Sequence, residues 1–276
     1  MAARGRTERM LVTKVTAESR GRQSDELIVE EPMTIQLDGI TVSTTMRTPG
    51  HDYELAVGFC HTEGLLAGAP VAGVRYCANG AASDGEWNVV TVDTGGRAPA
   101  PRARLGNTTS SCGLCGNDAI DELCDRLLPL PAPSDGSLPI PLDVLQAAPA
   151  ACRDAQALFG STGSVHAAAA FTATGDVLLV REDVGRHNAV DKVIGRMLLD
   201  RTLPATGLGL FVSGRASFEL VQKAWAAGFS SLVAVSAPTA LAVHTARRAG
   251  LVLAGFVRDD RMNVYSPERL PAPASS

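Results

Sequence analysis

Apolar and polar residues alternate along the first third of the chain, and this rhythm changes further on. Alternation with a period of two is typical of β-strands that bury one face. Proline at position 49 and glycine at position 64 are placed to begin and end a helix between them. The Asp38-Gly39 pair is a hairpin signal. The pattern predicts strands at 11–15, 26–29, 33–37, 40–46, 71–77 and 87–92.

From about residue 143 the pattern alternates between helical and strand periods. The expected helices cover 143–159, 187–199, 216–227 and 239–249, and the expected strands cover 164–171, 176–181, 208–213, 231–236 and 251–256. Strands that alternate with helices at this spacing imply right-handed crossovers. The second half therefore predicts a largely parallel sheet that is covered by helices on both faces.

A proline-rich stretch separates the two patterns, because it suits neither a helix nor an inner strand. It indicates an α/β protein whose larger second domain is preceded by a smaller β-rich α+β domain. The predicted parts are a disordered N-terminus at 1–9, a β-rich domain at 10–128, a linker at 129–141, an α/β domain at 142–266 and a tail at 267–276.

Composition narrows the class of protein. Hydrophobic residues make up 45% and charged residues 20% of the chain, and the net charge is −4. This balance gives no basic field for nucleic acid. No apolar run has the length of a membrane span, and no apolar signal region follows the N-terminal arginines. The six cysteines are too few and too scattered for a disulfide framework, which favours a reducing compartment. Charge, apolar runs and cysteines together predict a cytoplasmic protein without nucleic-acid or membrane partners.

Two of the cysteines, Cys112 and Cys115, lie three apart among glycines and small polar residues. Glycine gives the backbone freedom there, and little apolar surface draws the segment into a core. A helix is expected to begin just after them, at Asn117 or Asp118, and its positive end would favour the thiolate. Such a pair is compatible with a redox dithiol, half of a zinc site, or a carrier of sulfane sulfur.

The order of elements in the second half matches the cytidine-deaminase-like fold: a helix, a hairpin and three helix-strand units. Zinc deaminases need a His or Cys two residues before a glutamate and a later Pro-Cys-x-x-Cys motif. Here His166 is followed by four alanines, and the second half contains only Cys152. The sequence therefore predicts a three-layer α/β/α domain of this type without zinc and without deaminase chemistry.

Three strands of the second half end in turns that each lead into a helix. Two of these turns carry glycine and arginine, namely Gly185, Arg186 and His187 in the first and Gly214 and Arg215 in the second. If the strands are parallel, all three helices begin at the same edge of the sheet, where open α/β sheets bind ligands. Each glycine alone could serve a tight turn, but three such helix starts together predict a site for a phosphorylated ligand.

Several long motifs resemble those of the FdhD family, the accessory sulfurtransferases of formate dehydrogenase. The resemblance extends from about residue 30 to 265. Its motifs are Glu31-Pro32, Met46-Arg47-Thr48-Pro49-Gly50-His51-Asp52-Tyr53-Glu54-Leu55-Ala56-Val57-Gly58-Phe59, Thr62-Glu63-Gly64, the Ser-Ser-Cys-Gly-Leu-Cys-Gly segment, Arg181 to Val190, and Ser213 to Lys223.

The resemblance implies a sulfur carrier that takes sulfane sulfur from a cysteine desulfurase. The acceptor would be the bis-molybdopterin guanine dinucleotide of formate dehydrogenase, which holds molybdenum or tungsten. The family is also expected to be a homodimer with a zinc-free cytidine-deaminase-like domain. Carried over to this chain, Cys112 would form the persulfide with Cys115 as its partner, and the cofactor would be bound by Phe256, Val257, Arg258, Asp259, Asp260 and Arg261.

A zinc-binding or dithiol redox module is the alternative use of the two cysteines. A zinc site needs four ligands, and the chain offers no second Cys-x-x-Cys, although a homodimer would bring two segments together. His51 and His61 lack metal-ligand spacing and are interpreted as packing residues. A solvated loop remains the simpler interpretation of the residues that follow 256.

Overall fold

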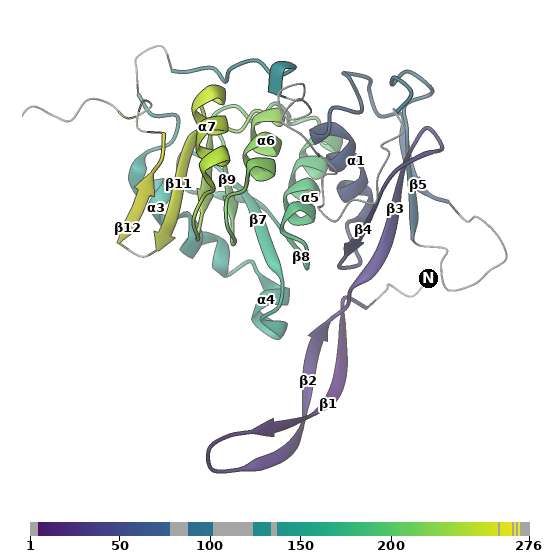
Figure 1. The fold of residues 1–276 in the computed structure, drawn as a ribbon, viewed down its shortest axis with the longest axis vertical. Helices are drawn as coiled ribbons and strands as arrows, with labels where there is room; N and C mark the ends of the chain where they lie inside the picture. Colours follow the sequence, from purple (N-terminus) through teal and green to yellow (C-terminus); the bar gives the residue numbers. More distant parts are fainter. Residues whose placement is uncertain are drawn as a thin grey trace, which may run out of the picture.

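A computed structural model describes residues 5–77, 88–101, 124–133, 137–258, 260–266, 268 and 270. Within these residues the strands form a two-stranded ribbon, a four-stranded sheet and a six-stranded sheet (Figure 1). Three of the predicted site residues, Cys112, Cys115 and Asp259, lie outside the described residues. None of the helices in the described part of the chain is long and apolar enough to cross a membrane.

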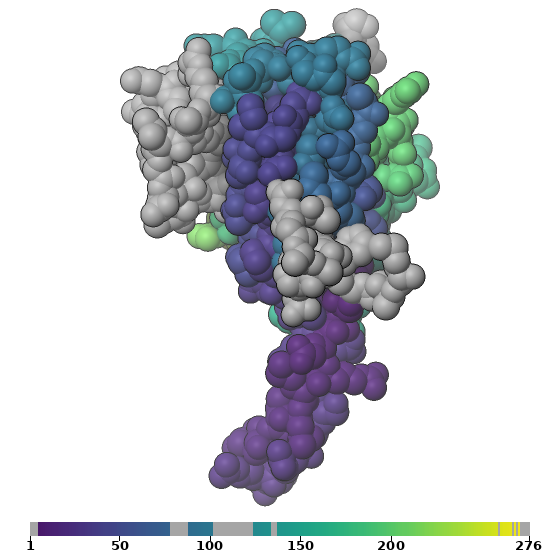
Figure 2. All heavy atoms as spheres, turned by 90° about the vertical axis from the view of Figure 1, so that its right-hand side faces the viewer, coloured from purple at the N-terminus to yellow at the C-terminus, as the bar shows by residue number. Residues whose placement is uncertain are grey.

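The ribbon consists of β1 (Thr7–Val15) and β2 (Arg20–Ile28), which are antiparallel from end to end. It stands away from the rest of the molecule (Figures 1 and 2). The sequence predicts only the last residues of each strand, because residues 20–26 are mostly polar and show no alternation. Both strands are therefore longer than expected.

The four-stranded sheet has the order β4-β3-β6-β5. Its strands are β3 (Glu31–Leu37), β4 (Ile40–Arg47), β5 (Gly73–Tyr76) and β6 (Val89–Asp93). The predicted hairpin at Asp38-Gly39 is confirmed, since both residues have positive φ. Helix α1 (Asp52–Thr62) covers this sheet and shares its core with Met33, Ile35 and Val90.

The six-stranded sheet has the order β12-β11-β10-β9-β7-β8. Its strands are β7 (His166–Phe171), β8 (Val177–Asp183), β9 (Gly209–Val212), β10 (Ser231–Ala234), β11 (Val252–Arg258) and β12 (Arg261–Val264). Only β9, β10 and β11 are mutually parallel neighbours, while β7 is antiparallel to β8 and β9, and β12 is antiparallel to β11. The expected solvated loop after residue 256 thus contains a strand.

Helices lie on both faces of this sheet because alternate strand residues point to opposite sides. One face packs on α5 (Arg186–Leu199), α6 (Phe218–Ala226) and α7 (Ala240–Ala249), and the other packs on α3 (Leu142–Arg153). The helix expected over 143–159 ends at Arg153, and a short helix α4 (Ala157–Thr162) follows. Glu182 explains the new start, because its carboxylate accepts hydrogen bonds from the amides of Leu158 and Phe159 at 2.9 and 2.8 Å.

Candidate functional site

Three helices begin at one edge of the six-stranded sheet. Because β7 runs antiparallel to both β8 and β9, strands β8, β9 and β10 point in the same direction. Their carboxyl ends therefore meet at one edge, where α5, α6 and α7 start (Figure 1). The structure brings the two predicted glycine-arginine turns together there.

Backbone hydrogen bonds join the turns at this edge into a continuous rim. The amide of Ser236 donates to Gly214 O at 3.3 Å, and the amide of Phe256 donates to Ser236 O at 3.2 Å. The turn after β10 is tied to the turn after β9 by the amide of Thr239, which donates to Ala216 O at 3.0 Å. The rim thus connects the ends of β9, β10 and β11.

Gly214 forms the floor of a small cradle on this rim. A Cβ atom at Gly214 would lie 3.4 Å from Nδ1 of His166 and 3.8 Å from Cδ of Arg186. The absence of a side chain leaves room for a methyl group between the imidazole of His166 and the aliphatic part of Arg186. Nε of Arg186 is buried and makes no hydrogen bond with the described part of the chain. A buried guanidinium nitrogen without a partner among the described residues makes this turn a candidate for holding an anion.

His166 is a member of this cradle that the sequence does not predict. It enters from β7, whose antiparallel position between β8 and β9 sets it beside both glycine turns. Burial lowers the pKa of His166, and the positive charge of Arg186 lowers it further. Its ring is therefore neutral near pH 7 and offers one donor and one acceptor nitrogen.

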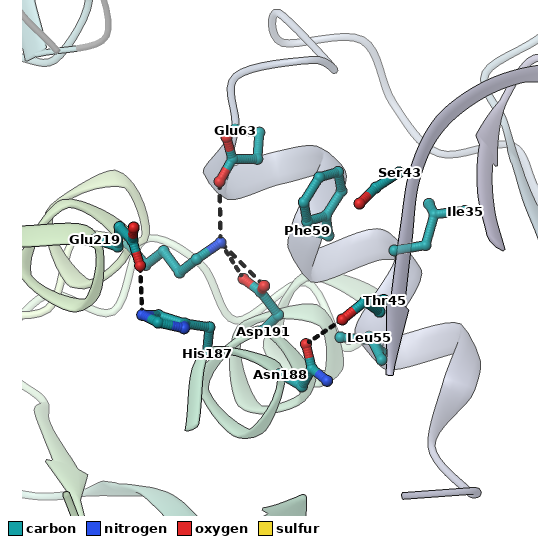
Figure 3. Close-up of a pocket in the computed structure, with 11 residues that line it drawn as sticks. Ile35, Ser43, Thr45, Leu55, Phe59, Glu63, His187, Asn188, Asp191 and Glu219 are labelled. Atoms are coloured by element: carbon teal, nitrogen blue, oxygen red, sulfur yellow. Dashed lines mark hydrogen bonds and ion pairs between the residues drawn. The ribbon is translucent and has the colours of Figure 1, made fainter. Parts of the chain in front are cut away.

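His187 lines a small pocket together with residues of β3, β4, α1 and α6 (Figure 3). Its Nε2 lies 2.5 Å from a carboxylate oxygen of Glu219 and 3.3 Å from Oγ of Ser217. The residue as a whole is only 8% exposed. His187 is thus held by α6.

Lys223 and Asp191 form the deep wall of the same pocket. The ammonium of Lys223 donates to Oδ1 of Asp191 at 2.9 Å, to Oε1 of Glu63 at 3.2 Å and to Oγ1 of Thr62 at 2.8 Å. Burial alone would lower the pKa of Lys223, but the carboxylates of Asp191 and Glu63 raise it. The cluster is satisfied by its own members, so we interpret it as a buried link between α1, α5 and α6.

The hairpin of β11 and β12 carries the remaining predicted cofactor residues. Phe256 has a φ of 53° and is 43% exposed, and it is held there by its bond to Ser236. Strained, exposed backbone of this kind gathers at functional sites. Arg258 and Arg261 face each other across the hairpin and are exposed, as is Asp260. Val257, by contrast, is fully buried in the core, so its side chain cannot touch a ligand.

A separate, larger cavity of about 1320 Å³ lies at the other end of α5. It is lined by the turn after α1, by Leu198 and Leu199 at the end of α5, and by Pro101 and Arg126. The last two residues lie on either side of the segment that carries Cys112 and Cys115. The described chain therefore enters and leaves this segment beside the cavity.

Comparison with known proteins assigns the chain to a family. The model of the FdhD/NarQ family matches residues 28–271. The chain belongs to the FdhD/NarQ family. It is 48% identical over 264 residues to the sulfur carrier protein FdhD of Nocardia farcinica, and the match covers 94% of this chain and 93% of that protein. The FdhD protein of Mycolicibacterium paratuberculosis is 47% identical over 266 residues, which cover 94% of this chain and 97% of the relative.

The fold is also similar to that of a solved structure. A formate dehydrogenase accessory protein of Desulfotalea psychrophila superposes with a TM-score of 0.74 at 22% identity, covering 97% of this chain and all of that one. The likeness concerns the fold. Ribbon residues 7–27 lie outside the match to the FdhD/NarQ model, which begins at residue 28.

Many of the motif residues that resemble FdhD lie along the contact between the two sheets. Asp183 pairs with Lys192 at 2.6 Å and accepts hydrogen bonds from the amides of Thr48 at 3.1 Å and Gly185 at 2.8 Å. Burial lowers the pKa of Lys192, and the charge of Asp183 opposes this effect. Through Gly185, the same carboxylate fixes the turn that presents Arg186 to the cradle.

Proposed function

We propose that the chain is a sulfur carrier that holds sulfane sulfur as a persulfide on Cys112 and delivers it to a molybdenum or tungsten cofactor of formate dehydrogenase. The observation that carries this proposal is the Cys112-x-x-Cys115 pair in a chain 48% identical to a protein named a sulfur carrier. A cysteine desulfurase is the proposed donor, and formate dehydrogenase is the proposed beneficiary. The transfer makes the chain a sulfurtransferase.

Sulfur transfer through a dithiol has a defined course. The thiolate of Cys112 attacks the outer sulfur of the persulfide on the desulfurase, and the desulfurase cysteine leaves as a thiolate. Cys112 then carries one added sulfur. The thiolate of Cys115 attacks the inner sulfur, forms a disulfide with Cys112 and releases the outer sulfur as hydrosulfide to the acceptor. A cellular thiol reductant must then restore the dithiol.

The acceptor of this sulfur is proposed to be bis-molybdopterin guanine dinucleotide, held at the rim of the six-stranded sheet. We place a phosphate at the cradle of His166, Arg186 and Gly214, because this cradle combines a glycine turn at a helix start, a neutral imidazole and a guanidinium nitrogen without a partner among the described residues. Arg215, Arg258 and Arg261 are exposed nearby and could pair with further phosphates or with guanine. When bound, the cofactor supplies the metal that takes the sulfur.

The cavity beside the ends of the Cys112 segment and the rim proposed to hold the cofactor lie apart. The transferred sulfur must cross the distance between them. Arg186 begins α5 and Leu199 ends it, so the two sites lie at opposite ends of a helix about 20 Å long by the usual rise. Ten residues lie between Pro101 and Cys112, and the eleven Cα-to-Cα steps of an extended chain span up to about 36 Å. The chain length therefore permits Cys112 to reach either end of α5.

Intact-protein mass spectrometry tests the persulfide. Wild type, Cys112→Ala and Cys115→Ala are incubated with a cysteine desulfurase and cysteine. We expect a gain of one sulfur, about 32 Da and reversible by reductant, on wild type and Cys115→Ala but not on Cys112→Ala. Failure of wild type to gain sulfur, together with a bound zinc ion, would favour the zinc-binding alternative. If Cys115→Ala also delivers sulfur at the wild-type rate, the resolving step is wrong.

Guanine-nucleotide binding tests the rim. Loss of one buried arginine-phosphate contact weakens binding by roughly 1.5–3 kcal/mol, or about 10- to 150-fold in Kd. We expect such losses for GDP in Arg186→Ala, measured by calorimetry, and smaller losses in Arg215→Ala and Arg258→Ala, whose side chains are exposed. Arg153→Ala, on α3, serves as the control. Unchanged GDP affinity in all three rim variants would place the nucleotide elsewhere.

The second domain is further proposed to be cytidine-deaminase-like. Support comes from the strand order β8-β7-β9-β10-β11 and from α3, which precedes the β7-β8 hairpin. This proposal carries the expectation that the purified protein holds no zinc, which metal analysis measures directly. Stoichiometric zinc in wild type that is lost in Cys112→Ala would contradict it.

A further inference from the structure

His166 is a partly buried histidine whose ring makes no hydrogen bond with the described part of the chain. The rings of His61 and His187 differ in this respect. Nε2 of His61 lies 3.2 Å from Ala226 O, and Nε2 of His187 lies 2.5 Å from a carboxylate oxygen of Glu219. The ring nitrogens of His166 are therefore open to a ligand or to water, and no protein partner fixes the protonation of this ring.

The ring of His166 and the side chain of Arg186 front the same glycine turn. The position of a Cβ atom at Gly214 lies 3.4 Å from Nδ1 of His166, 3.5 Å from its Cε1 and 3.8 Å from Cδ of Arg186. Nε of Arg186 is buried and also lacks a hydrogen-bond partner among the described residues. An anion that pairs with this guanidinium at the turn is therefore placed beside the imidazole as well.

The charges that face His166 keep its ring neutral while no anion is bound. Burial lowers the pKa of His166, the charges of Arg186 and His187 on α5 lower it further, and Asp183 on β8 opposes them. Strand β9, on the other side of β7, contributes no charged residue. Asp183 stands opposite His166 in the strand pairing, but its carboxylate is already paired with Lys192 at 2.6 Å. The positive charge of Arg186 thus dominates at this ring.

A bound anion would reverse this balance. A negative charge within about 4–6 Å favours the charged form of a base. It would also offset the field of Arg186, which otherwise repels a second positive charge at His166. Once protonated, the imidazole is a donor at both nitrogens, and a hydrogen bond from it to a phosphate oxygen is charge-assisted. Protonation and anion binding therefore strengthen each other by the same factor.

We propose that His166 is a proton-linked contact of the phosphate site: its ring is neutral in the empty site and takes up one proton from solvent when a diphosphate binds beside Arg186. The inference rests on the proposed function, because it concerns the rim proposed to hold the cofactor. It goes further by making the affinity of that rim depend on pH, with tighter binding in more acidic solution. The second positive charge is then present only when a ligand needs it.

Calorimetry tests the linkage with a ligand of constant charge. A terminal phosphate such as that of GDP titrates itself near about pH 6. We therefore choose GDP-mannose, in which both phosphates are diesters. Its Kd for wild type should rise at least about fivefold from pH 6 to pH 8, and titrations in two buffers of different ionisation enthalpy should show proton uptake on binding.

Two variants assign the proton to one ring. In His166→Asn, which keeps a polar group near Nδ1 but does not titrate, the Kd should be the same at pH 6 and pH 8 and the proton uptake should vanish. His244→Asn is the matched control. It removes an exposed histidine of α7 and should keep the pH dependence of wild type.

Nuclear magnetic resonance of the histidine rings gives a direct second readout. The chain has only five histidines, so the signal that is missing in His166→Asn identifies this ring. At pH 7 we expect the signal of a neutral imidazole in the free protein and that of a protonated imidazole with saturating GDP-mannose. A residue that only supports the turn would not change its protonation when the ligand binds.

The outcomes separate this inference from the phosphate site itself. A wild-type Kd that is equal at pH 6 and pH 8, with a ring that stays neutral in the complex, would overturn the proton linkage and leave the site in place. Unchanged pH dependence in His166→Asn would assign the proton to another group and overturn it too. Wild-type affinity in Arg186→Ala would instead remove the phosphate from the cradle. Circular dichroism of each variant ensures that only folded protein is compared.

Discussion

Gly58 of α1 and Gly195 of α5 bring the two helices into direct backbone contact. A Cβ atom at Gly58 would lie 1.9 Å from Asp191 O, and one at Gly195 would lie 1.8 Å from Glu54 O. Neither distance can be reached without moving a helix backbone. The contact sets the separation of the four-stranded and six-stranded sheets, because α1 packs on the first sheet and α5 packs on the second.

Replacing Gly195 by alanine is therefore expected to destabilise the whole protein. Overpacking of a tight core typically costs 1–3 kcal/mol, and the short distance to helix backbone puts Gly195→Ala at about 3 kcal/mol or more in the free energy of unfolding. Urea unfolding measures this loss. Gly160→Ala is the control, because that helical glycine has nothing within 4 Å of its would-be Cβ. Equal stability of the two variants would contradict the backbone contact.

The buried pair of Asp183 and Lys192 should be more costly to break than to remove. Asp183→Asn leaves the ammonium of Lys192 buried without its counter-charge, and loss of one partner of a buried pair typically costs about 3–5 kcal/mol. The double variant Asp183→Asn, Lys192→Met removes both charges and should recover much of that loss. Urea unfolding of Asp183→Asn, Lys192→Met and the double variant gives the coupling free energy. Additive effects of the two single changes would mean that the pair does not act as a unit.

The sequence is most informative where one hydrophobic period, either helical or strand-like, persists over a whole element. The helices and strands from 164 to 256 are predicted to within a few residues, because period and turn signals agree there. The glycine-arginine turns at Gly185 and Gly214 also come together at one sheet edge, since that follows from strand direction alone. The assignment of Cys112 and Cys115 stays a prediction, because both lie outside the described residues.

Other features depend on contacts that no local pattern encodes. The first residues of β2 are polar on both faces, so alternation gives no strand signal, and the ribbon appears only through its pairing with β1. His166 reaches the cradle because β7 inserts between β8 and β9. Arg181 bonds to Glu54 across 127 residues of sequence. The motifs that contain Glu54 and Asp183 therefore indicate a family, but they do not reveal that these two residues join the two sheets.

Filling the cradle at Gly214 should separate ligand binding from stability. The methyl group of Gly214→Ala would lie 3.4 Å from the ring of His166, which is ordinary contact, so the fold should accept it. The same methyl would occupy the space offered to an anion beside Arg186. We expect GDP affinity to fall about tenfold or more, the equivalent of about 1.4 kcal/mol, while the melting temperature stays unchanged. Wild-type GDP affinity in a folded Gly214→Ala would exclude the cradle as the phosphate site.

Glu54 makes the contact between the sheets sensitive to acid. Burial alone would raise the pKa of Glu54, but hydrogen bonds from Arg181 and His51 lower it to about 2, against 4.5 in the unfolded chain. The ionised group therefore stabilises the fold fully above pH 4.5, and its contribution is lost as the pH falls toward 2. Since Glu54 is partly screened by solvent, we expect a contribution of about 2 kcal/mol to the free energy of unfolding at pH 7.

Urea unfolding of wild type and Glu54→Gln at pH 7, 4 and 3 should show that the difference in their free energies of unfolding shrinks as the pH falls. The control is Asp200→Asn, which breaks an exposed pair with Arg196. It should change the free energy of unfolding by less than about 0.5 kcal/mol. A difference that stays constant down to pH 3 would mean that the carboxylate of Glu54 is not held by Arg181 in solution.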